Sequence, residues 1–209
     1  MVKTKIKDPV RVQKKQKQIF RGAMKVFRTK GFHAASIREI AKACRISLGS
    51  LYDYIETKED ILFLVHKEIL DQIYRRVDES LTKYQDPRDQ LTHVLAEIFR
   101  LSFQLKDEIL FIYTETKSLE KKYLYEVLQR ESEFVEAIEA MIRRGVNEGS
   151  FDSSNPAVLA NVIALTGAII PLRGWNILPH YGEKEVVDEL ITIFQKGLFV
   201  HKVPTTCDT

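Results

Sequence analysis

The sequence predicts an all-α protein of about nine helices, and three observations lead to that prediction. The 209 residues include only nine glycines and six prolines, too few for the many turns of an all-β fold. Apolar residues recur at three- and four-residue steps along most of the chain, as on one face of a helix. Residues that start and stop helices separate these stretches. With 44% apolar residues, the chain can also bury a sizeable core.

A basic helix is expected first, over Val10–Lys30. Gly31 follows it and is suited to end a helix in the left-handed conformation. The apolar residues of this helix are spaced so that they form a single stripe. These residues are Ile19, Ala23, Val26 and Phe27.

Two short helices are expected next. Ser36 is a good N-cap for a helix over Ile37–Cys44, and Glu39 completes a capping box with it. After a very tight turn, Ser47 caps a helix over Leu48–Tyr54. Three helices in the first 55 residues, the last two joined by such a turn, predict a helix-turn-helix unit.

Longer helices fill the rest of the chain. Thr57 and Asp60 form a cap that opens a helix over Lys58–Lys83, and Pro87 suits the first turn of the helix after it. The expected helices beyond the fourth cover Pro87–Leu105, Asp107–Thr116, Glu120–Asn147, Pro156–Trp175 and Glu183–Val200. The chain from His201 onward has no apolar period and is expected to be frayed.

The charge of the chain is unevenly distributed. Residues 1–30 contain eleven Lys or Arg and a single acid, Asp8, which gives a net charge of +10, whereas the remainder contains 21 basic and 28 acidic residues, which gives −7. A basic end on an acidic body points to a polyanionic partner at the N-terminus. The alternative is a solvated, lysine-rich tail, and composition alone does not decide between the two.

The sequence favours a cytoplasmic location. The longest nearly apolar run, Val158–Leu172, is shorter than the roughly 20 residues that a membrane-spanning helix needs. The basic N-terminus has no apolar stretch behind it, so no signal peptide is expected. The two cysteines, Cys44 and Cys207, lie far apart in the sequence, which fits a reducing compartment.

The expected helix-turn-helix has an apolar inner side and an outer side free for a partner. Ile37, Ile40 and Ala41 are expected to face inward from its second helix, and Ile46 to fill the turn. Leu51 and Ile55 would anchor the third helix. The residues left to face outward are Leu48, Gly49, Ser50, Tyr52, Asp53 and Tyr54. Exposed tyrosine hydroxyls are good donors to phosphate, and short side chains allow close approach to a duplex.

The run from Phe27 to Leu62 reads F-x3-G-F-x3-SIREIAKA-x2-IS-x-GSLY-x-YI-x-TKEDIL. It resembles the DNA-binding domain of TetR-family transcriptional repressors, without a gap. The resemblance implies a helix-turn-helix domain over residues 1–57 and a helical ligand-binding and dimerisation domain over residues 58–209. It further implies a homodimer that binds operator DNA and leaves it when an effector binds.

The resemblance also implies roles for individual residues. Arg38 matches a position that can reach a base edge, and Leu48 and Gly49 fall where direct groove contacts are made, so that Leu48 could meet a thymine methyl. The positions that match the phosphate-contacting set are Ser47, Ser50, Tyr52, Tyr54 and Lys58. Asp53 departs from the pattern, because it repels phosphate unless it accepts from cytosine N4. Cys44 stands where a small alanine is common and is expected to be a packed thiol.

Three of these residues could instead have a purely structural role. Tyr52 could merely pack on the first helix, and Leu48 could be an incidental surface leucine. Lys58 could interact only with its own helix end. The motif as a whole is a safer prediction than any single contact.

The last two expected helices have the pattern of a dimer interface. A stripe of small residues on the first of them permits close helix approach, and the last helix has one apolar face. The expected interface residues are Ala157, Ala160, Ala164, Gly167, Ala168, Leu190, Ile191, Phe194 and Leu198. The alternative is that these residues form core within one chain.

An aromatic-rich region between these helices and the fourth is a candidate effector pocket, although such a set is more often plain core. Its residues are Phe99, Phe103, Phe111, Tyr113, Phe134 and Trp175. The C-terminal half loosely resembles the family members that respond to fatty acyl chains or acyl-CoA, in the stretches 113–116, 149–152, 173–176 and 189–198. The resemblance therefore implies a small hydrophobic effector, a fatty acyl chain or an acyl-CoA.

Other function classes find little support. The sequence has no G-x-S-x-G, G-x-G-x-x-G, P-loop or H-E-x-x-H motif, so we do not expect an enzyme. Its five histidines show no ligand spacing with cysteines or carboxylates, so we expect no metal, and no cofactor is implied. The remaining alternative is an architectural protein that binds DNA through its basic arm without sequence preference.

Overall fold

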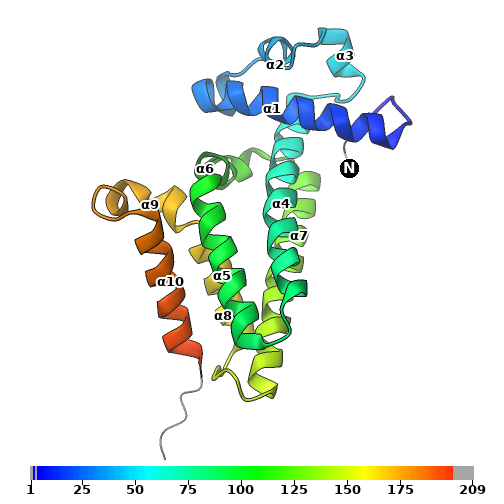
Figure 1. The fold of residues 1–209 in the computed structure, drawn as a ribbon. Helices are drawn as coiled ribbons and strands as arrows, with labels where there is room; N and C mark the ends of the chain where they lie inside the picture. Colours follow the sequence, from blue (N-terminus) through cyan, green and yellow to red (C-terminus); the bar gives the residue numbers. More distant parts are fainter. Residues whose placement is uncertain (1, 3, 200–209) are drawn as a thin grey trace, which may run out of the picture. The chain divides into compact units, whose positions relative to one another are not determined.

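The structure, a computed structural model, describes residue 2 and residues 4–199. Within these residues it contains ten α-helices and one short 3₁₀ helix, η1 (Figure 1). The helices are α1 (Pro9–Ala34), α2 (Ile37–Ala43), α3 (Leu48–Tyr52), α4 (Lys58–Lys83), α5 (Pro87–Gln104), α6 (Lys106–Glu115), η1 (Thr116–Ser118), α7 (Lys121–Asn147), α8 (Pro156–Thr166), α9 (Ile169–Ile177) and α10 (Glu183–Leu198). The predicted all-α fold is confirmed. The frayed end expected from His201 lies outside the described residues.

The prediction of a single helix over Pro156–Trp175 is wrong. The structure has two helices in this region, α8 and α9, with a bend of 56° between them. Pro171 explains the break, because a proline has no N–H and its ring clashes with the carbonyl four residues earlier, here that of Gly167. Gly167 also lies against α5, where an added Cβ would come within 2.9 Å of Ile98. Both Pro171 and Gly167 are visible in the sequence, but the prediction followed the long apolar run, which is typical of a single buried helix.

The predicted caps are present. Ser47 Oγ accepts from Ser50 N at 3.1 Å, at the start of α3. Thr57 and Asp60 exchange two bonds at the start of α4, from Asp60 N to Thr57 Oγ1 at 3.1 Å and from Thr57 N to Asp60 Oδ2 at 2.9 Å. Gly31 interrupts α1 with a φ of 73°, the left-handed conformation in which only glycine is free of strain.

The chain forms two compact units. The first comprises Met1–Tyr74 with Leu105–Glu131, and the second comprises Arg75–Gln104 with Ser132–Thr209. Both α4 and α7 therefore begin in the first unit and end in the second. The predicted domain division after residue 57 stays a prediction.

In the first unit, α1 packs against α2 and α6. Phe27 of α1 stacks on Phe111 of α6, with ring centroids 5.3 Å apart. Its core contains buried residues from all its α-helices, among them Ile19, Ala23, Phe27, Ile40, Leu51, Ile55, Ile61, Val65, Ile112 and Tyr123. In the second unit, α5 packs against α8, α9 and α10.

Cys44 is a packed thiol, as expected. It is buried beside α1, with its Sγ 3.7 Å from the carbonyl oxygen of Ile19. Burial raises the pKa of this thiol to about 11, so it stays protonated and unreactive near neutral pH. Cys207 lies outside the described residues.

Among the described residues, no single helix is both long and apolar enough to cross a membrane. The bent pair α8 and α9 meets that length and composition only when its two helices are taken together.

The contact between α1 and the end of α2 predicts the effect of a substitution. A Cβ on Gly22 would lie 2.3 Å from Cys44 Sγ and 2.8 Å from Cys44 N. Gly22→Ala is therefore expected to lower the free energy of unfolding by about 3 kcal/mol, a large overpacking cost because backbone must move. The matched control is Gly49→Ala, whose Cβ would meet open space on α3 and should leave stability unchanged or higher. Equal urea midpoints for the two variants would contradict this packing.

Candidate functional site

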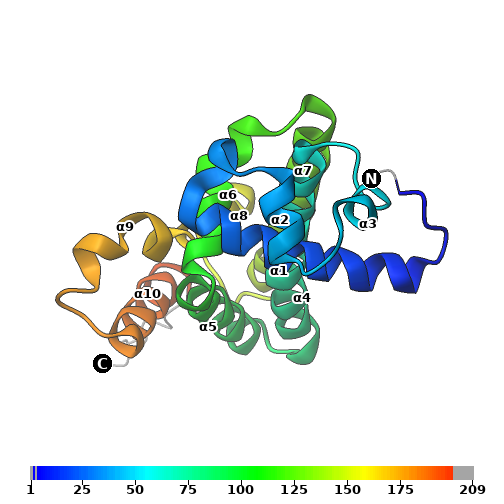
Figure 2. The same cartoon turned by 90° about the horizontal axis from the view of Figure 1, so that it is seen from above.

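The turn between α2 and α3 is held by backbone geometry. Arg45 has a φ of 55°, a left-handed conformation that is uncommon for a residue with a side chain. The N–H of Ile46 donates to the carbonyl of Ala41 at 3.1 Å, which closes the turn. The helix-turn-helix predicted from the sequence is therefore present, with α2 packed against both α1 and α3 (Figure 2).

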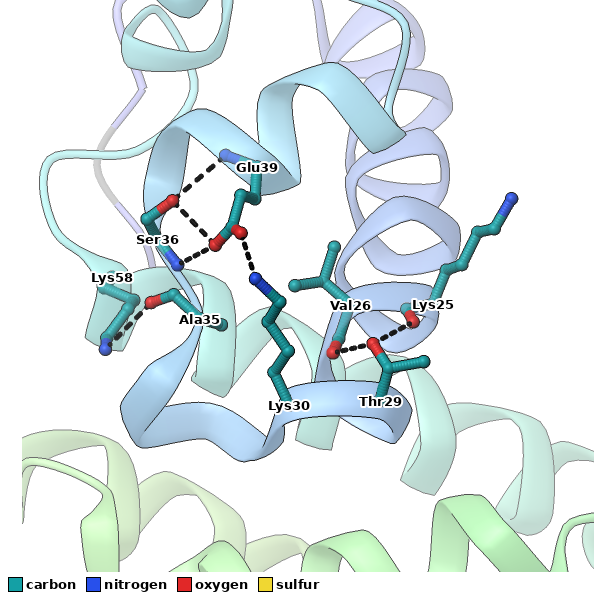
Figure 3. A network of polar contacts seen from close by, with 8 residues as sticks. All are labelled: Lys25, Val26, Thr29, Lys30, Ala35, Ser36, Glu39 and Lys58. Atoms are coloured by element: carbon teal, nitrogen blue, oxygen red, sulfur yellow. Dashed lines mark hydrogen bonds and ion pairs between the residues drawn. The ribbon is translucent and has the colours of Figure 1, made fainter.

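The start of α2 is stabilised by a network of polar contacts (Figure 3). Ser36 and Glu39 form the predicted capping box, in which Glu39 N donates to Ser36 Oγ at 3.2 Å and Ser36 N donates to Glu39 Oε2 at 3.0 Å. Lys30 of α1 donates to the other carboxylate oxygen of Glu39. The Lys30 ammonium, followed by the bonds from Ser36, lowers the pKa of Glu39 to about 2. The network holds the exposed Arg38 at the first turn of α2.

The outer side of α3 is as predicted at Gly49 and Tyr52, which are both exposed. Tyr52 is 38% exposed, and a Cβ on Gly49 would meet nothing within 4 Å. Ser47 is exposed, and Leu48, Ser50 and Asp53 are half-buried. These positions give α3 a face with one large side chain and open space around the glycine.

The expectation that Tyr54 faces outward is wrong, because its side chain is buried, with an exposed fraction of 2%. The physical reason is that α3 ends at Tyr52, with Asp53 as its C-cap. Beyond that point the helical face no longer determines where a side chain points. Tyr54 joins the core of the first unit instead.

Lys58 is engaged at the end of α1. Its Nζ donates to three carbonyl oxygens, those of Phe32 at 3.1 Å, His33 at 3.0 Å and Ala35 at 3.2 Å. It also lies 4.6 Å from the centroid of the Phe32 ring. These are orphan carbonyls where α1 ends, and a cation stabilises such an end. Lys58 thus caps α1 rather than its own helix, and its predicted contact with phosphate stays a prediction.

Asp60 is a buried carboxylate at the start of α4, and it has more partners than its cap requires. Its Oδ2 accepts from Glu56 N at 2.7 Å in addition to Thr57 N, and its Oδ1 accepts from the Tyr123 hydroxyl of α7. Burial raises the pKa of Asp60, but these hydrogen bonds outweigh it, so the pKa lies below its usual value. The Tyr123 ring stacks on Phe63, with centroids 4.3 Å apart. Nothing in a single sequence singles out Tyr123.

A cavity of about 250 Å³ lies in the first unit between α4, α6, η1 and α7. Its lining residues are His66, Leu70, Ile112, Tyr113, Thr116, Val127 and Glu131. His66 is fully buried, with Nδ1 3.0 Å from the Leu62 carbonyl oxygen and Nε2 3.3 Å from Thr116 Oγ1. Burial lowers the pKa of His66 and raises the pKa of Glu131, so both pKa shifts favour the neutral form. The cavity is an apolar space with a few polar groups.

The predicted pocket residues do not gather around this cavity, and of the six only Tyr113 lines it. Phe111 is buried against Phe27, and Phe99 is fully buried in the second unit, where it stacks on Phe194 at 6.1 Å. Trp175 is 71% exposed, with Arg173 over its ring at 5.4 Å. Phe103 and Phe134 are half-buried. Phe99 and Phe111 are therefore core, as the alternative allowed. His66 and Glu131 were missed because they are isolated polar residues in helices.

The small-residue stripe predicted for the dimer interface faces the protein's own core. Ala160 and Ala168 are buried, and Gly167 lies on Ile98 of α5, because small residues let α8 approach α5 closely. Phe194 and Leu198 of α10 are buried as well. The half-buried members of the predicted set are Ala157, Ala164, Gly167, Leu190 and Ile191. The assignment of Ala160, Ala168, Phe194 and Leu198 to the interface is therefore corrected, because they are core of the chain itself, and the rest of the set stays a prediction.

The fold and the site define a class, the helix-turn-helix DNA-binding proteins. Residues 19–65 match the family model of bacterial regulatory proteins of the tetR family, and residues 84–175 match that of a tetracyclin repressor-like C-terminal domain. The chain belongs to the TetR family of transcriptional regulators, which are DNA-binding regulators and not enzymes.

Individual relatives agree. The chain is 27% identical over 204 residues to the HTH-type transcriptional regulator HbdR of Aromatoleum sp. (strain CIB), covering 98% of this chain and 89% of that one. A solved complex of AibR with isovaleryl coenzyme A and operator DNA superposes with a TM-score of 0.72 at 20% identity, over 86% of this chain and 97% of that one. The fatty acid degradation regulator FadR from Bacillus halodurans superposes with a TM-score of 0.74 at 18% identity, over 92% and 97%. The two structural likenesses show the fold alone.

Proposed function

We propose that this regulator is a repressor that binds a two-fold symmetric operator as a homodimer and is released by a fatty acyl chain or an acyl-CoA. The observation that carries the proposal is the capped helix-turn-helix with exposed groups on α2 and α3, on a chain whose first thirty residues carry a net charge of +10. Arg38 and Tyr52 are exposed, and the space at Gly49 admits a duplex closely.

The alternative, a DNA-binding protein without sequence preference, needs only the basic charge. What favours a sequence-specific regulator is that the groups on α2 and α3 are held in one geometry. Lys30, Ser36 and Glu39 fix the start of α2, and Ser47 fixes the start of α3 (Figure 3). Base readout needs such positioning, whereas attraction to phosphate does not.

A second copy of the chain is the proposed partner of the exposed apolar side of α8 and α10. Val158 (58% exposed), Val162 (46%) and Leu165 (61%) lie three and four residues apart, so they share one face of α8. Ile193 of α10 is 54% exposed, and together with Val158 and Val162 it lines a groove of about 490 Å³ between the two helices. Contiguous exposed apolar side chains of this kind mark an interaction surface.

The effector is proposed to enter the cavity of the first unit with its acyl end. At about 30 Å³ per water-sized group, 250 Å³ holds roughly eight such groups. A short acyl chain fits that space, whereas a coenzyme A portion would have to stay outside. The relatives support this class, because AibR was solved with isovaleryl coenzyme A and FadR is a fatty acid degradation regulator.

The cavity is also connected to the helix-turn-helix through α4. His66 and Leu70 of its lining lie on α4, and the start of α4 is tied to α7 through Asp60 and Tyr123. An effector that binds better to one position of α4 shifts the population toward it. Operator affinity then falls by the difference in binding free energy between the two positions.

The DNA-binding role is tested with a duplex from the stretch upstream of the protein's own gene. The protein should shift this duplex in the presence of excess random competitor. Arg38→Ala should weaken binding by about 1–3 kcal/mol at particular base pairs while leaving random DNA unaffected. Equal weakening on specific and random duplexes would contradict a base-reading role for Arg38, and loss of the shift with competitor would favour the non-specific alternative.

The homodimer is tested by charging the exposed face of α8. The double variant Val162→Glu with Leu165→Glu should sediment as a monomer and lose operator binding, because burying two unpaired carboxylates opposes association. The control is Tyr125→Glu on α7, a residue that is 71% exposed in the first unit, and this variant should remain dimeric. A wild-type protein that sediments as a monomer at micromolar concentration would overturn the proposal.

The effector site is tested by filling the cavity. Isovaleryl-CoA, palmitoyl-CoA and free fatty acids are titrated into the operator complex, and one class should release the DNA. Val127→Phe, which fills the cavity, should abolish release while operator binding persists. Leu128→Phe, at the neighbouring 50% exposed position, should respond like the wild type. If no acyl compound releases DNA, the effector class is wrong and the regulator assignment is unaffected.

A further inference from the structure

The chain before α1 folds back along the helix-turn-helix and is attached to the end of α3 (Figure 2). The N–H of Lys5 donates to the carbonyl oxygen of Asp53 at 2.9 Å, and the Thr4 hydroxyl donates to the same oxygen at 3.0 Å. Asp53 is the C-cap of α3. The segment, which we name the N-terminal arm (residue 2 and residues 4–8), therefore has a fixed place beside the helix that is proposed to enter the groove.

The arm alternates between buried and exposed residues. Val2 is 5% exposed and belongs to the core of the first unit, and Ile6 is half-buried against the same core. Thr4, between them, uses its hydroxyl in the bond to Asp53. Lys5 and Lys7 are exposed. The apolar residues therefore attach the arm, and the two lysines are exposed to solvent. Lys3, the third lysine of this alternation in the sequence, lies outside the described residues.

The two arm lysines carry charge that the described structure does not neutralise. Among the described residues, no acidic side chain forms an ion pair with Lys5 or Lys7. The nearby carboxylate of Asp8 accepts from Val10 N at 3.0 Å and Arg11 N at 3.2 Å, so it serves as the N-cap of α1. A lysine-rich tail that only aids solubility needs no such attachment, whereas a contact with a fixed partner does. The family match begins at residue 19, so the arm lies outside it.

We propose that the N-terminal arm is a second DNA-contacting element, in which Lys5 and Lys7 bind phosphates of the duplex next to the groove entered by α3. This inference rests on the proposed function, since it requires that α3 meets DNA. Lysine ammonium groups bind phosphate as point charges and read no sequence. The arm therefore adds affinity and salt dependence, and base preference stays with α2 and α3.

The experiment measures the salt dependence of binding for the wild type and for the double variant Lys5→Ala with Lys7→Ala. The probes are the duplex from upstream of the protein's gene and a scrambled duplex of equal length. Each lost phosphate contact should reduce the slope of log K against log salt by about 0.9, so the double variant should lose about 1.8. Its affinity should fall by the same factor on both duplexes, with thermal stability unchanged.

The control is Lys117→Ala with Lys121→Ala, which removes the same charge from two exposed lysines of the first unit. This control should keep the wild-type slope. A wild-type slope in the arm variant, or an equal reduction in the control, would overturn the proposal, as the arm would then be a solvated tail or a source of general charge. If instead the wild type shifts neither duplex, the proposed function itself has failed.

Discussion

The buried carboxylate of Asp60 is the group on which the arrangement of the first unit depends. It accepts backbone bonds from Glu56 and Thr57 and a third bond from the Tyr123 hydroxyl, so one charge holds the segment after α3, the start of α4 and the start of α7. A carboxylate that is 4% exposed is tolerated only when it is satisfied in this way. The segment between α3 and α4 thus has a fixed connection to α7, one of the helices that line the cavity.

Two lysine ammonium groups stabilise the same unit at the end of α1. Lys58 caps the end of α1 through three carbonyls, and Lys30 pairs with the capping glutamate of α2. The end of α1 is thereby joined to the beginnings of α2 and α4 by charged groups. The proposed DNA contacts lie on α2 and α3, and the proposed release by an effector requires that a displacement of α4 reaches them through these contacts.

Local signals predicted the fold well, because caps, stop residues and apolar spacing act within a few residues of one another. Ser36, Ser47 and Thr57 cap the helices that the sequence assigned to them. Predictions that depended on which side of a helix meets which neighbour were less successful. Tyr54 is buried because α3 ends before it, and Ala160 of α8 and Gly167 at the end of α8 pack within the chain, Gly167 against α5. The cavity was missed since its polar lining residues His66 and Glu131 come together only through long-range packing.

The most direct test of this account is the free energy of unfolding of the wild type and of Tyr123→Phe, measured in urea at equal protein concentration from pH 7 to pH 3. The hydrogen bond lowers the pKa of Asp60, so its stabilisation exists above the unfolded value of 3.8 and is lost as pH falls through the folded value. The account predicts a loss of about 1–3 kcal/mol at pH 7, since a charged buried acceptor loses a donor, and a smaller difference at pH 3. Equal stabilities at pH 7, or a difference that does not shrink with acid, would contradict the role assigned to Asp60.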